Sequence, residues 1–409
     1  MDPRSLLFQV GGAALAPYAD SIPLVDHTVQ RFLKASKATH RLKSLVRWPP
    51  EHAVTRWLQF LESRSKAFLF SSTVFFIAAI GVIDYLTGVE LSFSILYLLP
   101  ISISAWLISR WAGVAVSIIS AIVWYVADLL SSSSYSSPIV PYWNATVMLG
   151  FFLTTAIILS ALRRTVDRDN KLAREIQEGL LPKAIPDVKG FEIAGAWLPA
   201  QSVSGDYYDV LRLDGDSIAV CVGDVAGHGI PAALLMSNLQ AAVRLLAPTL
   251  LPPRDLCVKL NKFVVDNTTP GNLITFFYGL LDLNKRELLY TNAGHQRPVV
   301  LRRDGTTLQL GEGGIPFGFD PEARYNQGVV QLEDGDLLLI YTDGALEIRN
   351  LQNEEFGEER FLKILKENHV SGASAVCNRI LSAVSEFSKG NRQDDLTLLA
   401  LYAQEPGSS

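Results

Sequence analysis

Aspartates placed beside glycines or next to apolar runs are the residues of this sequence best suited to chemistry. Apolar runs of this length are typical of buried strands, and a carboxylate at the edge of one costs free energy unless a cation meets it. Oxygen ligands gathered without cysteine pairs or a histidine cluster suit hard cations such as Mg²⁺ or Mn²⁺. The positions concerned are Asp206, Asp224, Asp343, Asp394 and Asp395.

An aspartate next to a glycine is also a common turn signal, and turns are the alternative explanation. Three pairs lie between short strand-like runs, as hairpin loops do: 214–215, 304–305 and 334–335. Asp224 and Asp343 differ because the runs before them stay apolar almost up to the acid. Spacing alone leaves a metal site and an ordinary turn as open alternatives at these two positions.

Length and composition restrict the class of protein. The 409 residues are enough for two or three domains, and the apolar residues are concentrated between Ala67 and Leu162. A formal net charge of -5 gives no basic footprint, so we expect no nucleic-acid partner. Cys221, Cys257 and Cys377 are widely spaced and indicate reduced packing residues of a cytoplasmic domain, without disulfide or metal roles.

Four apolar segments in the first half are each near the ~20 residues that a membrane-spanning helix needs. Lys and Arg are missing from the links between the first and second segments and between the third and fourth segments. Basic residues instead stand before the first segment and after the fourth. The positive-inside rule therefore predicts a multi-pass membrane protein, in contact with lipid, with both termini in the cytoplasm. The segments are 67–86, 91–109, 111–130 and 142–162.

Two acids lie within these segments, and a basic stretch precedes them. Asp84 and Asp128 fall near the predicted outer ends, where an intramembrane carboxylate is a candidate for ligand sensing although its desolvation cost is smaller. The stretch 31–47 interleaves Lys and Arg with apolar residues. An amphipathic helix on an anionic membrane and a solvated basic face are both open explanations for it.

The last apolar segment can continue as a helix into the cytoplasm. The stretch 163–181 contains no proline, and Leu172, Ile176 and Leu180 form one apolar stripe between charged flanks. Such a helix could carry a signal or a homodimer contact, although the stripe is too short to prove a coiled coil. Pro182 marks its end.

From residue 191 the pattern changes to short strands separated by turns, with a few helices among them. Tight turn signals predict antiparallel hairpins, and two antiparallel sheets packed between helices are the natural layered solution. The expected strands are 191–197, 207–213, 217–223, 275–282, 286–291, 298–302, 329–332, 336–341 and 396–402, and the expected helices are 232–246, 254–267, 358–367 and 373–387.

A series of motifs runs through the same region, at 176–182, 199–200, 204–209, 223–229, 276–279, 292–295, 341–347 and 393–397. Their residues and their order closely resemble the SpoIIE/RsbU-type serine phosphatases, which are related to type 2C protein phosphatases. The resemblance covers about residues 173–402. It implies an α+β fold, a four-layer α/β/β/α sandwich of two antiparallel sheets between helices, here preceded by an all-α four-helix transmembrane domain.

The resemblance also implies a centre of two Mn²⁺ or Mg²⁺ ions and gives catalytic and metal-binding roles to four aspartates. Asp224 would bridge the two ions, and the backbone carbonyl of Val225 would bind one of them. Asp343 and Asp394 would hold the second ion, and Asp206 would bind metal or orient its water. Two such ions activate water for in-line attack on a phosphoryl group, so no covalent nucleophile is needed.

Neighbouring residues of the motifs are expected to have other roles. Asp395 lies beside the ligand position and ranks below the others. His228 stands four residues after Asp224, whereas related enzymes place a histidine two residues after the bridging acid, so we favour a structural role in its turn. Asn292 and His295 are expected to be loop scaffolding near the site.

These observations predict a membrane-anchored protein serine/threonine phosphatase of the bacterial inner (cytoplasmic) membrane. Its substrate would be a phosphorylated regulatory protein, an anti-sigma-factor antagonist in this family. A pseudophosphatase that binds a phosphoprotein without turnover is the alternative, and a transporter is disfavoured because the spans contain few polar groups. The expected parts are a cytoplasmic segment 1–66, a transmembrane sensor 67–162, a helical linker 163–186, a phosphatase domain 187–403 and a tail 404–409.

Overall fold

The computed structural model describes residues 61, 64–87, 93–131, 135, 137–214, 216–269, 271–390 and 392–404. The chain divides into two compact units, Met1–Arg163 and Arg164–Ser409, called unit 1 and unit 2 below. The predicted basic stretch 31–47 lies outside the described residues, as do residues 405–409 of the expected tail.

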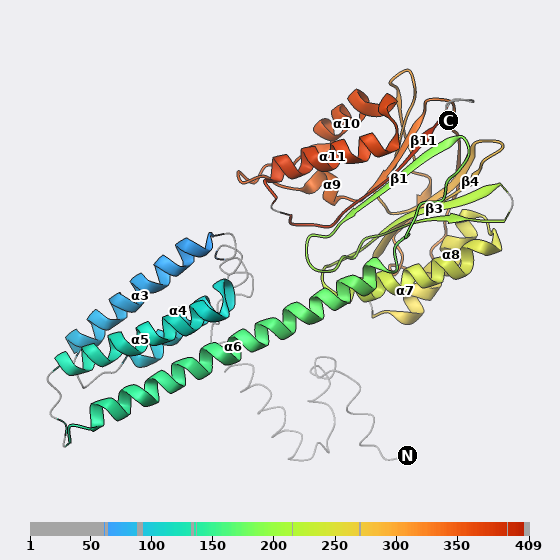
Figure 1. Cartoon of the computed structure of the whole chain (residues 1–409). Helices are drawn as coiled ribbons and strands as arrows, with labels where there is room; N and C mark the ends of the chain where they lie inside the picture. The colour runs from blue at the N-terminus through green and yellow to red at the C-terminus, as the bar shows by residue number, and fades with distance from the viewer. Residues whose placement is uncertain are drawn as a thin grey trace, which may run out of the picture. The chain divides into compact units, whose positions relative to one another are not determined.

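Unit 1 is helical throughout its described part (Figure 1). Its second apolar segment is not the single helix that the sequence predicts: it is divided into a 3₁₀ turn, a short α-helix and a π-helical turn. Pro100 falls in this stretch, and proline cannot donate a helical hydrogen bond. The elements are α3 (Lys66–Thr87), η3 (Ser94–Tyr97), α4 (Leu98–Ile103), η4 (Ser104–Ile108), α5 (Arg110–Leu130) and α6 (Val140–Glu178), the last of which continues into unit 2.

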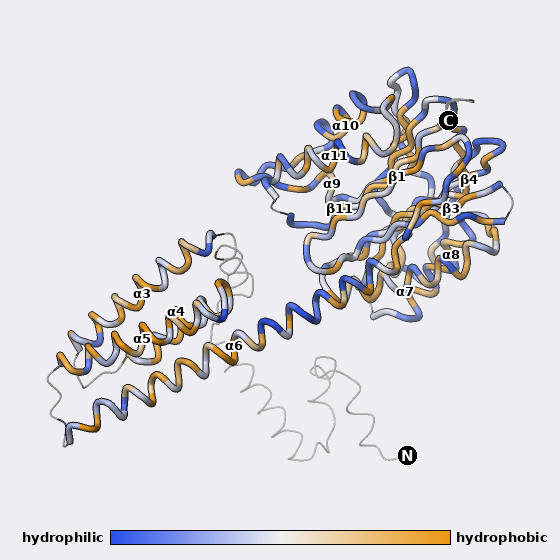
Figure 2. The backbone as a smooth tube through the Cα atoms, viewed as in Figure 1, coloured by the Kyte–Doolittle hydropathy of each residue, from blue (hydrophilic) through white to orange (hydrophobic). Residues whose placement is uncertain are grey.

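Apolar side chains both fill and cover unit 1. Ile77, Tyr97 and Phe152 are fully buried in its core, whereas Phe75 and Trp111 are 71% and 73% exposed. Figure 2 shows hydrophobic residues along α3, α5 and the first part of α6, and a hydrophilic second part of α6. Exposed apolar area of this extent is what a helix surface in contact with lipid requires.

By length and composition, four helices of the described residues could cross a membrane. Three of them are α3, α5 and α6, and the shorter apolar stretch Ser94–Ile108 lies between the first two. The fourth, Ile230–Thr249, belongs to unit 2, where it packs against a sheet. It is therefore an amphipathic helix of a globular unit, and the apolar module is confined to unit 1.

Unit 2 consists of two packed sheets with helices on both outer faces (Figure 1). One sheet has the strand order β1-β11-β10-β6-β7, and the other has the order β2-β3-β4-β5-β8 with β9 also paired to β5. The strands are β1 (Phe191–Leu198), β2 (Tyr207–Arg212), β3 (Ser217–Val225), β4 (Ile274–Asp282), β5 (Glu287–Ala293), β6 (Val299–Leu301), β7 (Thr307–Gln309), β8 (Gly313–Gly314), β9 (Gly328–Gln331), β10 (Leu337–Tyr341) and β11 (Leu396–Ala403).

Helices cover each sheet on the side away from the other sheet. On one side α11 packs on β1 and β11, and on the other α7 packs on β3 while α8 packs on β4 and β5. The predicted α/β/β/α sandwich is therefore confirmed. The helices are α7 (Ile230–Leu246), η5 (Ala247–Thr249), α8 (Pro253–Asn267), α9 (Gly344–Glu347), α10 (Gly357–Asn368), η6 (His369–Ser371) and α11 (Ala373–Ser388).

Strand β10 contributes side chains to two hydrophobic cores, one between the sheets and one between its sheet and the helices α10 and α11. Leu338 and Ile340 point into the core between the sheets, whereas Leu337 and Leu339 pack with the helices α10 and α11. Successive strand side chains face opposite sides, so a strand covered on both faces is apolar throughout. This explains why the runs leading to Asp343 and Asp224 are continuous.

The strand pattern differs from prediction in two respects. β3 extends through Asp224 to Val225, so Asp224 lies within a paired strand, opposite Thr275 of β4, and not in the turn after it. β7 and β8 were not predicted because they are only three and two residues long. β8 also pairs in parallel with β5, an exception in two otherwise antiparallel sheets.

Candidate active site

Four strands deliver the predicted acids to one end of the sandwich. Asp224 lies in β3, and Asp206 directly precedes β2, which pairs with β3. Asp343 follows β10, and Asp394 stands two residues before β11, the antiparallel partner of β10. The end of one antiparallel strand lies beside the start of its neighbour, so residues far apart in sequence meet here.

Asp206 joins the two sheets at this end. Its side chain is 1% exposed, and its Oδ2 accepts hydrogen bonds from the hydroxyls of Thr342, at 2.8 Å, and Thr397, at 2.7 Å. Thr342 Oγ1 in turn accepts the backbone N–H of Thr397 at 2.9 Å. Neither threonine was predicted, although Thr342 directly precedes Asp343 in its motif.

Burial raises the pKa of all four acids, and neighbouring carboxylates raise it further for Asp206, Asp224 and Asp394. Burial, and next the charge of Asp343, raise the pKa of Asp224 to about 7, and burial followed by Asp343 raises that of Asp394 to about 6. Burial followed by the charge of Asp224 raises the pKa of Asp206, and burial raises that of Asp343. The charged groups that raise the pKa of Asp206, Asp224 and Asp394 are carboxylates, so negative charge accumulates at this end of the sandwich.

The donor set fits hard divalent cations, because every candidate ligand is an oxygen. The Val225 carbonyl also lies at this end, where a Cβ added to Gly205 would come within 2.9 Å of its oxygen. Among the described residues, however, no three acidic, histidine or cysteine side chains converge closely enough to hold a metal ion. The acids thus lie near one another without forming a closed coordination sphere. Repulsion between carboxylates would favour such a separation.

Asp395 has a different role from its neighbour Asp394. It is 8% exposed, and its two oxygens accept the backbone N–H groups of Ala200, at 2.7 Å, and Gly205, at 2.9 Å. Both acceptor oxygens are used to fix the loop that leads to Asp206. The lower rank of Asp395 as a metal ligand stays a prediction.

The C-terminal end of α6 reaches the same loop. Gln177 is 3% exposed; its Nε2 donates to the Ser204 carbonyl at 2.7 Å, and its Oε1 accepts the Ser204 N–H at 2.9 Å. The hydroxyl of Ser204 accepts the N–H of Asp206 at 2.9 Å. Two steps of hydrogen bonding therefore connect α6 with Asp206, a link that the apolar stripe did not reveal because Gln177 lies beside it.

The motif histidines lie around the acids in different settings. His228 is exposed in a turn between Gly227 and Gly229, whose φ angles of 101° and 76° favour glycine. His295 is buried; one ring nitrogen lies 2.8 Å from the Thr275 hydroxyl, and burial lowers its pKa to about 4. A neutral His295 beside the strand partner of Asp224 suits the predicted scaffolding role.

Asn292 supports the same loop from β5. Its side chain accepts the backbone N–H of His295 at 2.7 Å and donates to the Leu310 carbonyl at 3.2 Å. Both of its bonds are therefore to backbone groups that shape the loop, as expected of scaffolding.

Another buried acid of the same motif is paired with a cation. Asp209, in β2, accepts the Arg244 guanidinium at 2.8 Å and the Tyr207 hydroxyl at 2.9 Å. It lies three residues after Asp206, so its side chain and that of Asp206 face opposite sides of the chain. Arg244 comes from α7, and its pairing was not predicted.

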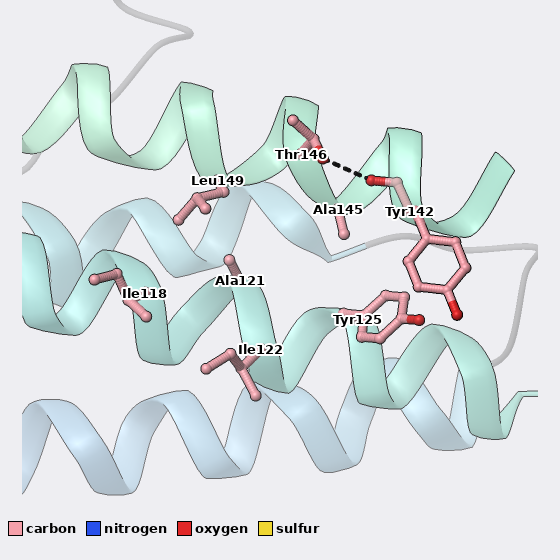
Figure 3. Close-up of a pocket in the computed structure, with 8 residues that line it drawn as sticks. All are labelled: Ile118, Ala121, Ile122, Tyr125, Tyr142, Ala145, Thr146 and Leu149. Carbon is pink, nitrogen blue, oxygen red and sulfur yellow. Dashed lines mark hydrogen bonds between the residues drawn. The ribbon is translucent and has the colours of Figure 1, made fainter. Parts of the chain in front are cut away.

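A groove in unit 1 has a different character (Figure 3). It lies between α5 and α6, has a volume of about 250 Å³ and is lined by Ile118, Ala121, Ile122, Tyr125, Tyr142, Ala145, Thr146 and Leu149. The Thr146 hydroxyl donates to the backbone carbonyl of Tyr142, at 2.8 Å. With mainly apolar walls and no ionisable acid, this groove has no means of catalysing hydrolysis.

Comparisons with known proteins agree with the fold. Residues 214–404 match the family model "Stage II sporulation protein E (SpoIIE)". The chain is 29% identical to "Phosphoserine phosphatase RsbU" of Bacillus subtilis over 59% of this chain and 72% of that protein. The solved SiaA-PP2C domain of Pseudomonas aeruginosa superimposes with a TM-score of 0.52, at 20% identity, over 59% of this chain and 99% of that one.

The catalytic domain of PstP, solved in complex with two manganese ions, is a more distant match. It is 15% identical, with a TM-score of 0.40 over 53% of this chain and 99% of that one. The sandwich of two antiparallel sheets between helices gives unit 2 a PP2C-like fold. Within that fold class, residues 214–404 match the SpoIIE family model, and the C-terminal half of the chain is similar to the phosphoserine phosphatase RsbU.

Proposed function

We propose that this protein is a membrane-anchored, metal-dependent phosphatase that hydrolyses phosphoserine or phosphothreonine on a regulatory protein. One observation carries the proposal: strand pairing brings Asp206, Asp224, Asp343 and Asp394 to one end of the sandwich, where burial and neighbouring carboxylates raise the pKa of Asp206, Asp224 and Asp394. Such an arrangement is unfavourable without bound cations, because the carboxylates repel one another, and this favours cation binding.

Asp224, the Val225 carbonyl, Asp343 and Asp394 would hold two Mg²⁺ or Mn²⁺ ions, with Asp206 binding metal or its water. When bound, these ions supply an activated water near neutral pH and stabilise charge on the phosphoryl oxygens. Thr342 and Thr397 fix the Asp206 carboxylate, because two hydroxyls donate to one of its oxygens. Asp395 holds the neighbouring loop, so the acids are presented by a rigid frame.

The substrate proposal rests on the similarity to RsbU of Bacillus subtilis, a phosphoserine phosphatase. For this chain we propose a phosphorylated protein of the anti-sigma-factor antagonist class. The site lies at the exposed edge of strands, with Asp394 exposed and Asp224 partly buried, so a phosphorylated side chain on a folded partner can approach it.

Membrane anchoring is the second part of the proposal. The helices α3, α5 and α6 are long and apolar enough to cross a bilayer, and their exposed apolar side chains suit lipid. Basic residues flank their predicted inner ends, which would place both termini in the cytoplasm of a bacterial inner membrane.

Regulation through α6 is the third part. This helix is continuous from Val140 to Glu178, and Gln177 near its end holds the loop before Asp206. Leu172 and Ile176 are 54% and 61% exposed on the otherwise polar second half, so they offer an apolar contact for a second copy of the chain. A rotation of paired helices would move Gln177 and hence the position of Asp206.

The deciding experiment measures hydrolysis of p-nitrophenyl phosphate by residues 164–409, which form a compact unit with their own cores. Turnover should require Mn²⁺ or Mg²⁺, stop with chelator, and fall at least ~1,000-fold in Asp224→Asn, since the charge that holds the ions is removed. A folded fragment that captures a phosphoprotein without hydrolysing it in Mn²⁺ would instead support the pseudophosphatase.

Gln177→Leu tests the proposed regulatory contact, with Glu178→Gln as the matched control on the exposed face of α6. The leucine leaves both backbone groups of Ser204 without their buried partner. We expect the Mn²⁺ concentration for half-maximal activity to rise about tenfold in Gln177→Leu, a loss of ~1.4 kcal/mol, and to stay unchanged in the control. Equal metal requirements in both variants would contradict the coupling.

A further inference from the structure

The end of unit 1 where α3 begins contains a cavity of a different kind from the apolar groove of Figure 3. It has a volume of about 290 Å³ and is lined by Arg64, Lys66, Leu69, Leu107 and Arg163. Among the described residues of its wall, three are basic and none is acidic. Its size is close to the ~300 Å³ lower limit of small-ligand sites, so it suits a compact ionic group.

The three basic residues come from distant parts of the chain. Arg64 and Lys66 stand at the start of α3, whereas Arg163 belongs to α6, 97 positions after Lys66. The preference for basic residues at the inner ends of membrane helices explains their number, but not their convergence on one cavity. Arg110 shows the difference: it is exposed, its guanidinium lies over the Trp111 ring, and it does not line the cavity.

Contacts with η4 hold Arg163 in place. Its Nη1 donates to the Trp106 carbonyl at 3.2 Å, and its guanidinium carbon lies 5.4 Å from the centre of the Trp106 ring. About one turn earlier on α6, the Ser160 hydroxyl donates to the Ala105 carbonyl at 3.4 Å. A guanidinium held in this way is preorganised for an anion, because little side-chain freedom remains to be lost on binding.

The start of α3 adds partial positive charge to the same cavity. Lys66 is the first residue of the helix, Leu69 lies in its first turn, and that turn contains no acid. The N-terminal end of a helix dipole favours an anion. Leu69 is 3% exposed and Leu107 is half-buried, so the basic side chains stand beside an apolar wall. Such a wall suits an amphiphilic anion better than a fully hydrated one.

In the proposed membrane arrangement, on which this inference rests, the cavity lies at the depth of lipid headgroups. Lys66 begins the 22-residue helix α3, and Arg163 lies 23 residues beyond Val140, about 35 Å along α6. The hydrocarbon core of a bilayer is about 30 Å thick, so both residues reach its polar boundary. The basic flanks assign this end of the helices to the cytoplasmic side.

We propose that Arg64, Lys66 and Arg163 form a binding site for the headgroup phosphate of an anionic phospholipid. Three cations around one phosphodiester disfavour a zwitterionic lipid, because its headgroup would bring a further positive charge into the cavity. The acyl chains would stay in the bilayer, against exposed apolar side chains such as Phe68, which is 52% exposed.

Native mass spectrometry of the full chain in neutral detergent tests the proposal by counting bound lipids. We expect one saturable site per chain for phosphatidylglycerol, and at least about tenfold weaker binding of phosphatidylcholine with the same acyl chains. Arg64→Gln, Lys66→Gln and Arg163→Gln should each weaken phosphatidylglycerol binding about fivefold, the factor expected for one basic residue near an anionic surface. Inorganic phosphate, the water-soluble source of the same group, should not displace the lipid at equal concentration.

Arg110→Gln is the matched control, because it removes a basic residue of the same unit, on the same predicted side of the membrane, that does not line the cavity. Phosphatidylglycerol binding should be unchanged in this variant. Elution volume and helical circular dichroism would show that each variant is folded. Equal binding of the two lipids, an equal loss in Arg110→Gln and Arg163→Gln, or displacement by inorganic phosphate would overturn the proposal.

Failure of the proposed function would be recognised separately. A chain without a membrane anchor would remain in the soluble fraction of disrupted cells, whereas a membrane-bound chain that does not distinguish the two lipids would contradict the headgroup site alone. Phosphatase activity is not read in any of these measurements, so an inactive phosphatase domain would leave their outcome unchanged.

Discussion

Asp206 and Asp209 are separated by two residues and are each 1% exposed, yet they lie in opposite electrostatic surroundings. Asp206 has Asp224 and Asp395 as charged neighbours, and its pKa is raised. Asp209 accepts the guanidinium of Arg244 from α7. The same motif thus contains one acid in a group of acids and one acid in an ion pair.

The difference separates function from stability. A buried carboxylate with its own cation is complete, and removing either partner leaves an uncompensated charge. A buried carboxylate among other carboxylates has no such partner, and binding of a cation from solution lowers the free energy of the folded state. Burial and motif membership alone would not distinguish the two; the neighbouring charges do.

The largest effect on the free energy of unfolding is expected from divalent cations, which should act at Asp224 and not at Asp209. At about 100 times Kd, Mg²⁺ or Mn²⁺ is expected to stabilise residues 164–409 by about 2.7 kcal/mol, because the ions bind the folded state alone. Thermal unfolding with and without metal measures the shift. The shift should persist in Asp209→Asn and disappear in Asp224→Asn; the reverse pattern would mean that the two regions have been assigned the wrong way round.

Asp209→Asn should have the next largest effect, on stability alone. Breaking a buried ion pair costs ~3–5 kcal/mol, and we expect about 2 kcal/mol here because the Arg244 side chain is 43% exposed. Urea unfolding of residues 164–409 would measure it, with metal-dependent activity of the folded protein retained. A stability equal to that of the unaltered chain would show that the pair contributes no net free energy.

The smallest effect is expected on the surface of α6. Arg174 and Glu178 form an i, i+4 ion pair at 2.8 Å, with side chains 44% and 50% exposed. Arg174→Gln should change the free energy of unfolding by less than about 0.5 kcal/mol, since solvent screens the pair. A loss above about 1 kcal/mol would indicate that the exposed face of α6 has a further partner.

Much of the fold was predictable because periodicity and turns are local signals. Strands such as β1 and β11 and helices such as α8 and α11 lie within two residues of their predicted bounds. The division of the second apolar segment into η3, α4 and η4 was missed because hydropathy averages over a window and does not register hydrogen-bond type. β8 was missed because two residues carry no periodic signal.

The acids of the site were predicted, but their supports were not. Asp224 and Asp343 stand out in the sequence because they follow apolar runs. Thr397 and Gln177 act only through distant partners: Thr397 contacts Asp206, which is 191 positions away, and Gln177 contacts Ser204, which is 27 positions away. Arg244 pairs with Asp209 across 35 residues. Such partners are fixed by the packing of sheets and helices, and no local pattern in one sequence reveals them.

The strand order of unit 2 has a consequence for synthesis of the protein. β11, the last strand, lies between β1 and β10, pairing with both along most of its length. On the ribosome, β1 therefore stays unpaired with the rest of the five-stranded sheet until residues 396–403 have emerged. A nascent chain cannot hold Asp394 beside the other acids before then, because pairing of β11 with β10 fixes its position. A premature stop just before β11 removes the strand that joins β1 to β10 and leaves the remaining acids without their frame.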